Sequence, residues 1–149
     1  MLNEEVGRCA VGAACALFDP QGRILLVRHS YGRLNWELPG GGALPGEDPR
    51  TAAQRELLEE TSLDLSPDAL TGVYFEPGHD FGPFMHFVFR VAWREGLAPA
   101  AVPPEITEVG FYEFDALPRP ISDFTQRRIL DAMADPATFE TVDQRIWFE

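Results

Sequence analysis

The sequence predicts an α/β (α+β) sandwich, in which helices pack on a β-sheet. Two observations predict this class: strand-like runs and helical segments alternate along the chain, and 45% of the residues are apolar, including 11 Phe and 3 Trp. The chain has 149 residues and contains no repeat, low-complexity segment or linker. We therefore expect residues 1–149 to form a single domain with one core.

The first two elements are expected to be strands, over Cys9–Phe18 and Arg23–Arg28, where apolar and β-branched residues run continuously. The four residues between them, DPQG at 19–22, favour a hairpin turn. Cys9 and Cys15 would lie roughly 20 Å apart on an extended strand, whereas a disulfide needs Cα atoms within about 7 Å. We expect two buried, reduced thiols.

A helix is expected after the glycine cluster at 40–42. Asp48 is a suitable N-cap, and Pro49 suits the first helical position, where its missing N–H does no harm. The helix should continue to about Glu60.

The remaining elements alternate again. Strands are expected over Leu70–Glu76, Phe84–Trp93 and Val109–Phe114, with a last helix over Phe124–Ala134. Along the second of these strands the apolar residues share one face, while His86 and Arg90 share the other. That second face would either line a site or meet solvent.

The charge of the chain is strongly negative. It has 24 acidic and 12 basic residues, the basic ones all Arg, for a net charge of −12. Without lysine the chain cannot form a Schiff base or carry the lysine of a phosphate-binding Walker loop. The net charge also disfavours duplex nucleic acid as a partner, since that affinity comes from neutralising phosphates. If the protein binds phosphates, we expect a divalent metal ion to offset the negative charge of the protein.

No membrane partner is expected. The apolar run at 9–18 is far shorter than the roughly 20 residues that span a bilayer. We therefore expect a cytoplasmic protein.

The helix after the glycine cluster carries a group of carboxylates. Glu56, Glu59 and Glu60 share one face, because residues three and four apart are neighbours on a helix. Such a group of hard oxygen ligands suits Mg²⁺ or Mn²⁺. The competing interpretation is an ordinary solvated acidic face. Arg55, which could hold a carboxylate, and Glu47, which could reach the same cluster, both favour the metal.

The segment 41–63, GGALPGEDPRTAAQRELLEETSL, resembles the Nudix box, G-x5-E-x7-R-E-U-x-E-E-x-G-U with U an aliphatic residue. Eight of the nine defined positions match, and a chance match in this chain has odds of about one in a million. Ser62 stands where the box has its final glycine. Because this position follows the end of the helix, we expect Ser62 to adopt a positive φ at a cost of about 1 kcal/mol.

The resemblance implies an α/β/α sandwich with a mixed sheet. It implies hydrolysis of a diphosphate linkage in a small-molecule nucleoside diphosphate joined to a group X, with Mg²⁺, or Mn²⁺, as cofactor. It also allows a homodimer. Carried over by position, the metal ligands are Glu56, Glu59 and Glu60, the carboxylate-orienting residue is Arg55, and the glycines close to ligands or phosphates are Gly40, Gly41 and Gly42.

Either Glu56 or the downstream Glu105 is expected to position the attacking water, and Glu108 is a further downstream candidate. Substrate-facing candidates are equally open, because aromatic residues on strands more often belong to the core. They are Phe75, Phe81, Phe84, His86 and Arg90.

A second functional class is a Nudix-fold module that binds a nucleotide without cleaving it. The intact set of Arg55, Glu56, Glu59 and Glu60 favours the enzyme, since a module freed from catalysis need not keep these residues.

Overall fold

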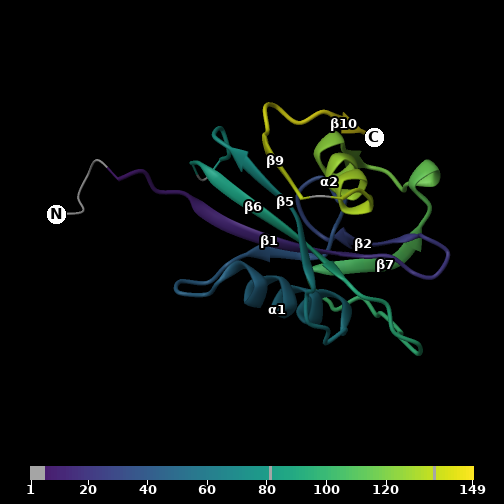
Figure 1. Cartoon of the computed structure of the whole chain (residues 1–149). Coiled ribbons are helices and arrows are strands. Elements are labelled where there is room, and N and C mark those ends of the chain that lie inside the picture. Colours follow the sequence, from purple (N-terminus) through teal and green to yellow (C-terminus); the bar gives the residue numbers. More distant parts are fainter. Residues whose placement is uncertain (1–5, 81, 136) are drawn as a thin grey trace.

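The fold places a central β-sheet between two helices (Figure 1). It is seen in a computed structural model that describes residues 6–80, 82–135 and 137–149. Helix α1 covers Pro49–Thr61 and helix α2 covers Asp123–Met133, and they lie on opposite faces of the sheet (Figure 1). The predicted α/β/α arrangement is confirmed.

The central sheet has five strands in the order β4-β1-β6-β5-β9. The β1–β6 and β5–β9 pairs are parallel and the other two pairs are antiparallel, so the sheet is mixed, as expected. Its strands are β4 (Gly40–Gly42), β1 (Ala10–Leu17), β6 (Phe84–Val91), β5 (Ala69–Glu76) and β9 (Thr138–Thr141).

Two smaller sheets complete the strand arrangement. The first is antiparallel in the order β3-β2-β7, and the second pairs β10 with β8. A short 3-10 helix, Phe114–Ala116, follows β7. The strands are β2 (Ile24–His29), β3 (Trp36–Glu37), β7 (Ile106–Tyr112), β8 (Ile121–Ser122) and β10 (Trp147–Phe148).

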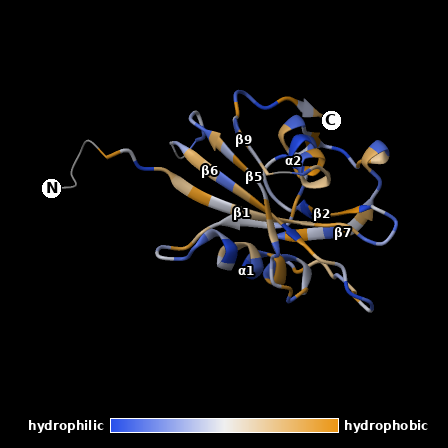
Figure 2. Cartoon of the chain, viewed as in Figure 1, coloured by the Kyte–Doolittle hydropathy of each residue, from blue (hydrophilic) through white to orange (hydrophobic). Residues whose placement is uncertain are grey.

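Strand β1 is buried on both faces, and its alternating side chains divide the core in two. Cys15 and Leu17 belong to the layer beneath α1, with Leu57. Ala14 and Ala16 belong to the layer beneath α2. Each helix shows both orange and blue residues in Figure 2, as expected when one side packs on a sheet and the other meets solvent.

The ends of α1 follow the sequence signals. Asp48 caps the first turn by accepting a hydrogen bond from the Thr51 N–H at 3.0 Å, and Pro49 occupies the first turn. At the other end Ser62 has φ 67° and ψ 9°, and its N–H donates to the Leu58 carbonyl. The expected positive φ at Ser62 is confirmed.

Ser62→Gly should therefore stabilise the protein. A glycine removes the Cβ conflict of the left-handed conformation, and part of that gain is lost to the greater freedom of glycine in the unfolded chain. We expect a net gain of about 0.5–1 kcal/mol, or roughly 2–3 °C in Tm, measured by thermal unfolding. Ser66→Gly, an exposed position that has no positive φ, should lower Tm instead. An unchanged or lower Tm for Ser62→Gly would contradict the strain.

Two expectations need correction. Cys15 is buried, but Cys9 is exposed, because β1 begins only at Ala10 and the preceding residues lie outside the sheet. Both thiols are free, as expected. The turn at 19–22 does reverse the chain, but β1 and β2 then diverge into different sheets and share only the Phe18–Ile24 bridge.

The C-terminal segment packs onto the fold. Strand β9 extends the central sheet beside β5, Val142 is buried in the α2 layer, and β10 pairs with β8. Among the described residues, no helix is both long and apolar enough to span a membrane.

Candidate active site

Arg55 on α1 joins several carboxylates. Its Nε and Nη2 each donate to Glu47 at 2.8 Å, a two-pronged contact that fixes both side chains. Its Nη1 donates to Glu56 at 3.0 Å and to Glu59 at 3.1 Å, and Nη2 also reaches the Gly42 carbonyl at 3.0 Å. One guanidinium thus orients three carboxylates and ties them to β4.

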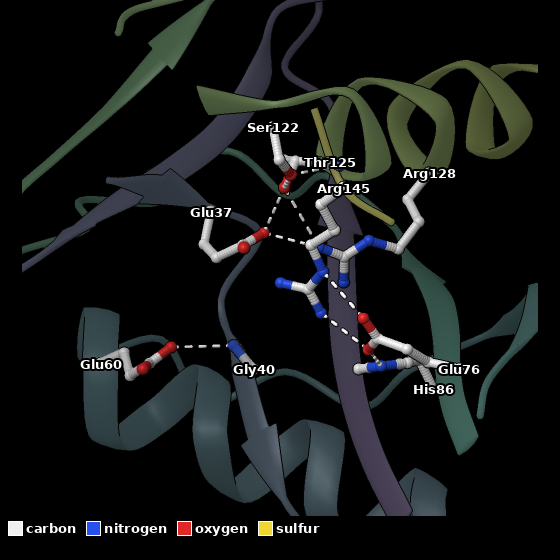
Figure 3. Close-up of polar contacts among 9 residues, drawn as sticks. All are labelled: Glu37, Gly40, Glu60, Glu76, His86, Ser122, Thr125, Arg128 and Arg145. Atoms are coloured by element: carbon white, nitrogen blue, oxygen red, sulfur yellow. Dashed lines mark hydrogen bonds and ion pairs between the residues drawn. The ribbon is translucent and has the colours of Figure 1, made fainter. Parts of the chain in front are cut away.

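The glycine strand β4 lies directly against these carboxylates. A Cβ on Gly41 would come within 2.6 Å of Glu56 Oε1, so a side chain there would displace Glu56. The Gly40 N–H donates to Glu60 Oε1 at 2.8 Å (Figure 3). The strand therefore approaches the helix closely because it has no side chains.

Glu60 is the least exposed member of the cluster, at 3%. Its recorded hydrogen bond comes from Gly40, and no Arg or His side chain in the described part of the chain forms an ion pair with it. Burial, together with nearby negative charges that include Glu56 and Glu105, raises the pKa of Glu60 to about 8, although the Gly40 N–H opposes the shift. A buried carboxylate without a cation is costly unless another positive group approaches.

The donor chemistry of the cluster fits a divalent metal ion. Glu56, Glu59 and Glu60 offer only carboxylate oxygens, which Mg²⁺ and Mn²⁺ prefer. Within residues 6–80, 82–135 and 137–149, no three such side chains already form a complete metal site. Glu56 and Glu59 face Arg55, and Glu60 faces Gly40, so binding an ion would require these side chains to reorient.

The two downstream carboxylates differ in their surroundings. Glu105 is exposed, and its backbone carbonyl accepts a hydrogen bond from the Ser30 N–H. Its charge raises the pKa values of Glu56 and Glu60, so it lies within electrostatic reach of the cluster. Glu108 instead pairs with Arg28 at 2.9 Å.

A cavity of about 230 Å³ opens beside the glycine strand, on the side facing α2. Its wall includes residues of β4 together with polar and aromatic side chains from several distant segments, some of which are drawn in Figure 3. These side chains include Glu37, His86, Phe124, Arg128 and Arg145.

The first polar group in the wall joins β3 to α2. Glu37 Oε1 accepts hydrogen bonds from the Thr125 hydroxyl and from Arg128 Nη2, both at 2.6 Å (Figure 3). Burial alone would raise the pKa of Glu37, but Arg128 and Thr125 outweigh it and lower that pKa below its ordinary value. Glu37 and Arg128 therefore form a buried, charged pair.

The second polar group joins β5, β6 and the C-terminal segment. Glu76 accepts hydrogen bonds from Arg145 Nε at 3.2 Å and from Arg145 Nη2 at 3.0 Å. His86 Nε2 lies 2.9 Å from Glu76 Oε1. Burial and the Arg128 charge lower the pKa of His86 to about 4, so this imidazole is neutral at pH 7.

This depressed pKa predicts a pH dependence of stability. Between pH 6.5 and about 4 the unfolded chain binds a proton at His86 that the folded chain does not bind. The free energy of unfolding should therefore fall by up to about 3 kcal/mol as the pH drops through this range. Chemical denaturation of His86→Gln should show a shallower decline. Identical pH profiles of the free energy of unfolding for the wild type and His86→Gln would contradict the lowered pKa of His86.

Only some of the substrate-facing candidates on strands line the cavity. Phe84 and His86 line the cavity and stack with ring centroids 4.5 Å apart. Arg90 does not face it, because its guanidinium donates to backbone carbonyls at the end of α2. Phe75 is not part of the cavity wall, and Phe81 lies outside the described residues.

Sequence reasoning missed the two arginines of the cavity. Arg128 had a detectable signal, since it lies four residues after the buried Phe124 and so places a charge on the buried face of α2. Arg145 had none, because only the packing of the C-terminal segment brings it to the cavity.

Comparisons with known proteins agree on one family. The family model described as NUDIX domain matches residues 9–133. A MutT-like protein of Streptomyces ambofaciens is 31% identical over 124 residues, which are 83% of this chain and 77% of the relative. An RNA pyrophosphohydrolase of Proteus mirabilis is 40% identical over 63 residues, which are 42% of this chain. That match spans only 34% of the relative's own length.

Solved structures agree with the sequence comparison. The crystal structure of a MutT NUDIX hydrolase from Burkholderia pseudomallei matches with a TM-score of 0.72 and 26% sequence identity. The match covers 84% of this chain and 98% of that chain.

Proposed function

Since this chain belongs to the Nudix family and is a Nudix hydrolase, we propose that it hydrolyses the diphosphate linkage of a nucleoside diphosphate joined to a second group X. The substrate is a small molecule, the cofactor is Mg²⁺ or Mn²⁺, and residues 1–149 act as one domain. The reaction is attack of water on phosphorus, with a phosphorylated product on each side of the cleaved bond.

The observation that supports this proposal best is the environment of Glu60. A buried carboxylate without a cation lies on the same helix face as Glu56 and Glu59, against the glycine strand. With Glu47, the cluster has four carboxyl groups and only one guanidinium, that of Arg55, so its charge is negative in excess. A bound divalent cation would offset it.

The residues would divide the work as follows. Glu56, Glu59 and Glu60 would hold the metal ion, which when bound would neutralise charge on the diphosphate and make the attacking water more acidic. Arg55 would hold the carboxylates in position through its contacts with Glu47, Glu56 and Glu59.

The remaining roles concern substrate and water. Gly40, Gly41 and Gly42 would let the diphosphate approach the strand closely. Glu56 or Glu105 would position the water. A normal turnover rate for Glu105→Gln at saturating Mg²⁺ would eliminate Glu105.

A panel of nucleoside diphosphate derivatives tests this function, with release of phosphate or nucleotide followed in Mg²⁺ or Mn²⁺. The wild type should cleave at least one compound, and Glu59→Gln should lose most of that rate. Glu95→Gln, which changes an exposed loop carboxylate, is the matched control and should keep it. Tight nucleotide binding without cleavage of any compound would favour a non-catalytic binding module instead.

A further inference from the structure

Arg145 reaches the cavity from a part of the chain that the family match does not cover. The match ends at residue 133, whereas Arg145 lies between β9 and β10. Its guanidinium is held by Glu76 and lies over the Phe124 ring, with Cζ 4.9 Å from the ring centroid. The C-terminal segment thus contributes a fixed, mostly buried cation to the cavity wall.

The nitrogen atoms of Arg145 are only partly used. Nε and Nη2 both donate to Glu76, whereas no residue in the described part of the chain accepts a hydrogen bond from Nη1. Figure 3 shows this third nitrogen turned away from Glu76, toward the side where Glu37 and Gly40 lie. Its N–H groups are therefore available to a molecule in the cavity.

A second guanidinium in the same wall is also incompletely satisfied. Arg128 is 6% exposed, and its buried Nε has no hydrogen-bond partner among the described residues. A buried N–H without a partner is rare in folded proteins, because a buried donor that makes no hydrogen bond costs free energy. Because this Nε is itself buried, the unused donor that a molecule in the cavity can reach is Nη1 of Arg145.

The charges around the cavity are nonetheless balanced. Arg128 is paired with Glu37, Arg145 is paired with Glu76, and the His86 imidazole between them is neutral at pH 7. A phosphate group placed here would meet the Glu37 carboxylate and two guanidinium groups whose charges are already offset by ion pairs. The wall suits an uncharged group rich in hydrogen-bond acceptors, with a flat surface for the aromatic rings of Phe84 and Phe124.

We infer that Arg145 is a specificity-determining residue, which donates from Nη1 to the exocyclic oxygen at C6 of a purine base or C4 of a pyrimidine base of the substrate. The inference rests on the proposed function, because it takes the diphosphate to lie at the carboxylate cluster and the base to lie in the neighbouring cavity. Guanine and uracil carry an oxygen at this position and satisfy the donor, whereas adenine and cytosine carry an amino group there, which opposes it.

The test compares matched substrates with the same diphosphate and the same X. The wild type should prefer guanosine to adenosine compounds and uridine to cytidine compounds. Arg145→Gln should lower kcat/KM by about 10- to 100-fold for the guanosine and uridine compounds, mainly through KM, and should change kcat/KM for the adenosine and cytidine compounds by less than about threefold. Arg127→Gln, which removes a partly exposed arginine outside the cavity, should leave the preference unchanged.

A structural role for Arg145 gives a different pattern. Glu76→Gln weakens the same ion pair but keeps the guanidinium, so it should lower Tm and retain the base preference. Equal losses with all four bases in Arg145→Gln, or losses that follow X rather than the base, would overturn the inference. If the wild type cleaves none of the compounds, the proposed function fails. Calorimetric binding of the same nucleotides to wild type and Arg145→Gln then still tests the base preference.

Discussion

Glu60→Gln should lower kcat by roughly 10³-fold, because loss of a metal ligand forfeits several kcal/mol of charge stabilisation and each 1.4 kcal/mol is about tenfold in rate. The same change should not destabilise the chelator-treated protein. The glutamine keeps an oxygen to accept the Gly40 N–H and replaces a carboxyl that is buried without a cation and is therefore costly to ionise. Rates are measured at saturating Mg²⁺, and Tm is measured in chelator.

The stability comparison is sharpest at pH 9. Because the pKa of Glu60 in the folded chain is raised to about 8, ionising this carboxyl as the pH rises destabilises the metal-free protein, and the glutamine avoids that loss. Tm for Glu60→Gln should equal or exceed that of the wild type. Mg²⁺ should raise the wild-type Tm and leave the variant nearly unchanged. A large drop in Tm for the metal-free variant would contradict this account of Glu60.

Arg128→Met should destabilise the protein by about 3–5 kcal/mol, the range typical of removing one partner from a buried ion pair. Glu37 would then remain buried with its charge and would keep only the Thr125 hydroxyl among its two recorded donors. The loss should be measured by chemical denaturation at pH 7.

Two further variants distinguish the loss of this ion pair from a general effect of removing an arginine from α2. Arg127→Met removes the neighbouring arginine of α2, whose ion pair with Glu140 is partly exposed, and should change stability by less than about 1 kcal/mol. The double variant Glu37→Gln, Arg128→Met should recover part of the loss, because no buried charge remains. Equal effects of Arg127→Met and Arg128→Met, or no recovery in the double variant, would contradict a coupled pair.

Much of the fold could be predicted because its signals are local. Asp48 and Pro49 mark the start of α1, and continuous apolar runs mark β1 and β2. The shortest strands could not be predicted. Strands such as β4, three glycines, and β8, two residues, have no periodicity to detect, and their pairing partners lie far away in the sequence.

The candidate site, too, could be predicted only in part. The carboxylates of α1 share a helix face, so their proximity follows from sequence spacing, and Arg55 lies within reach of them for the same reason. The cavity wall combines β3, β6, α2 and the C-terminal segment. No local pattern relates Glu37 to Arg128 or Glu76 to Arg145, because tertiary packing alone brings these side chains together.

Release of the nucleotide product as a function of Mg²⁺ concentration tests the central claim most directly. Mg²⁺ is titrated into chelator-treated wild type and Glu60→Gln, with a compound that the wild type cleaves. We predict no product without the ion, a saturable rise in rate for the wild type, and a maximal rate roughly 10³-fold lower for Glu60→Gln. Equal rates for the two proteins, or full activity of the wild type in chelator, would contradict a metal site built on the carboxylates of α1.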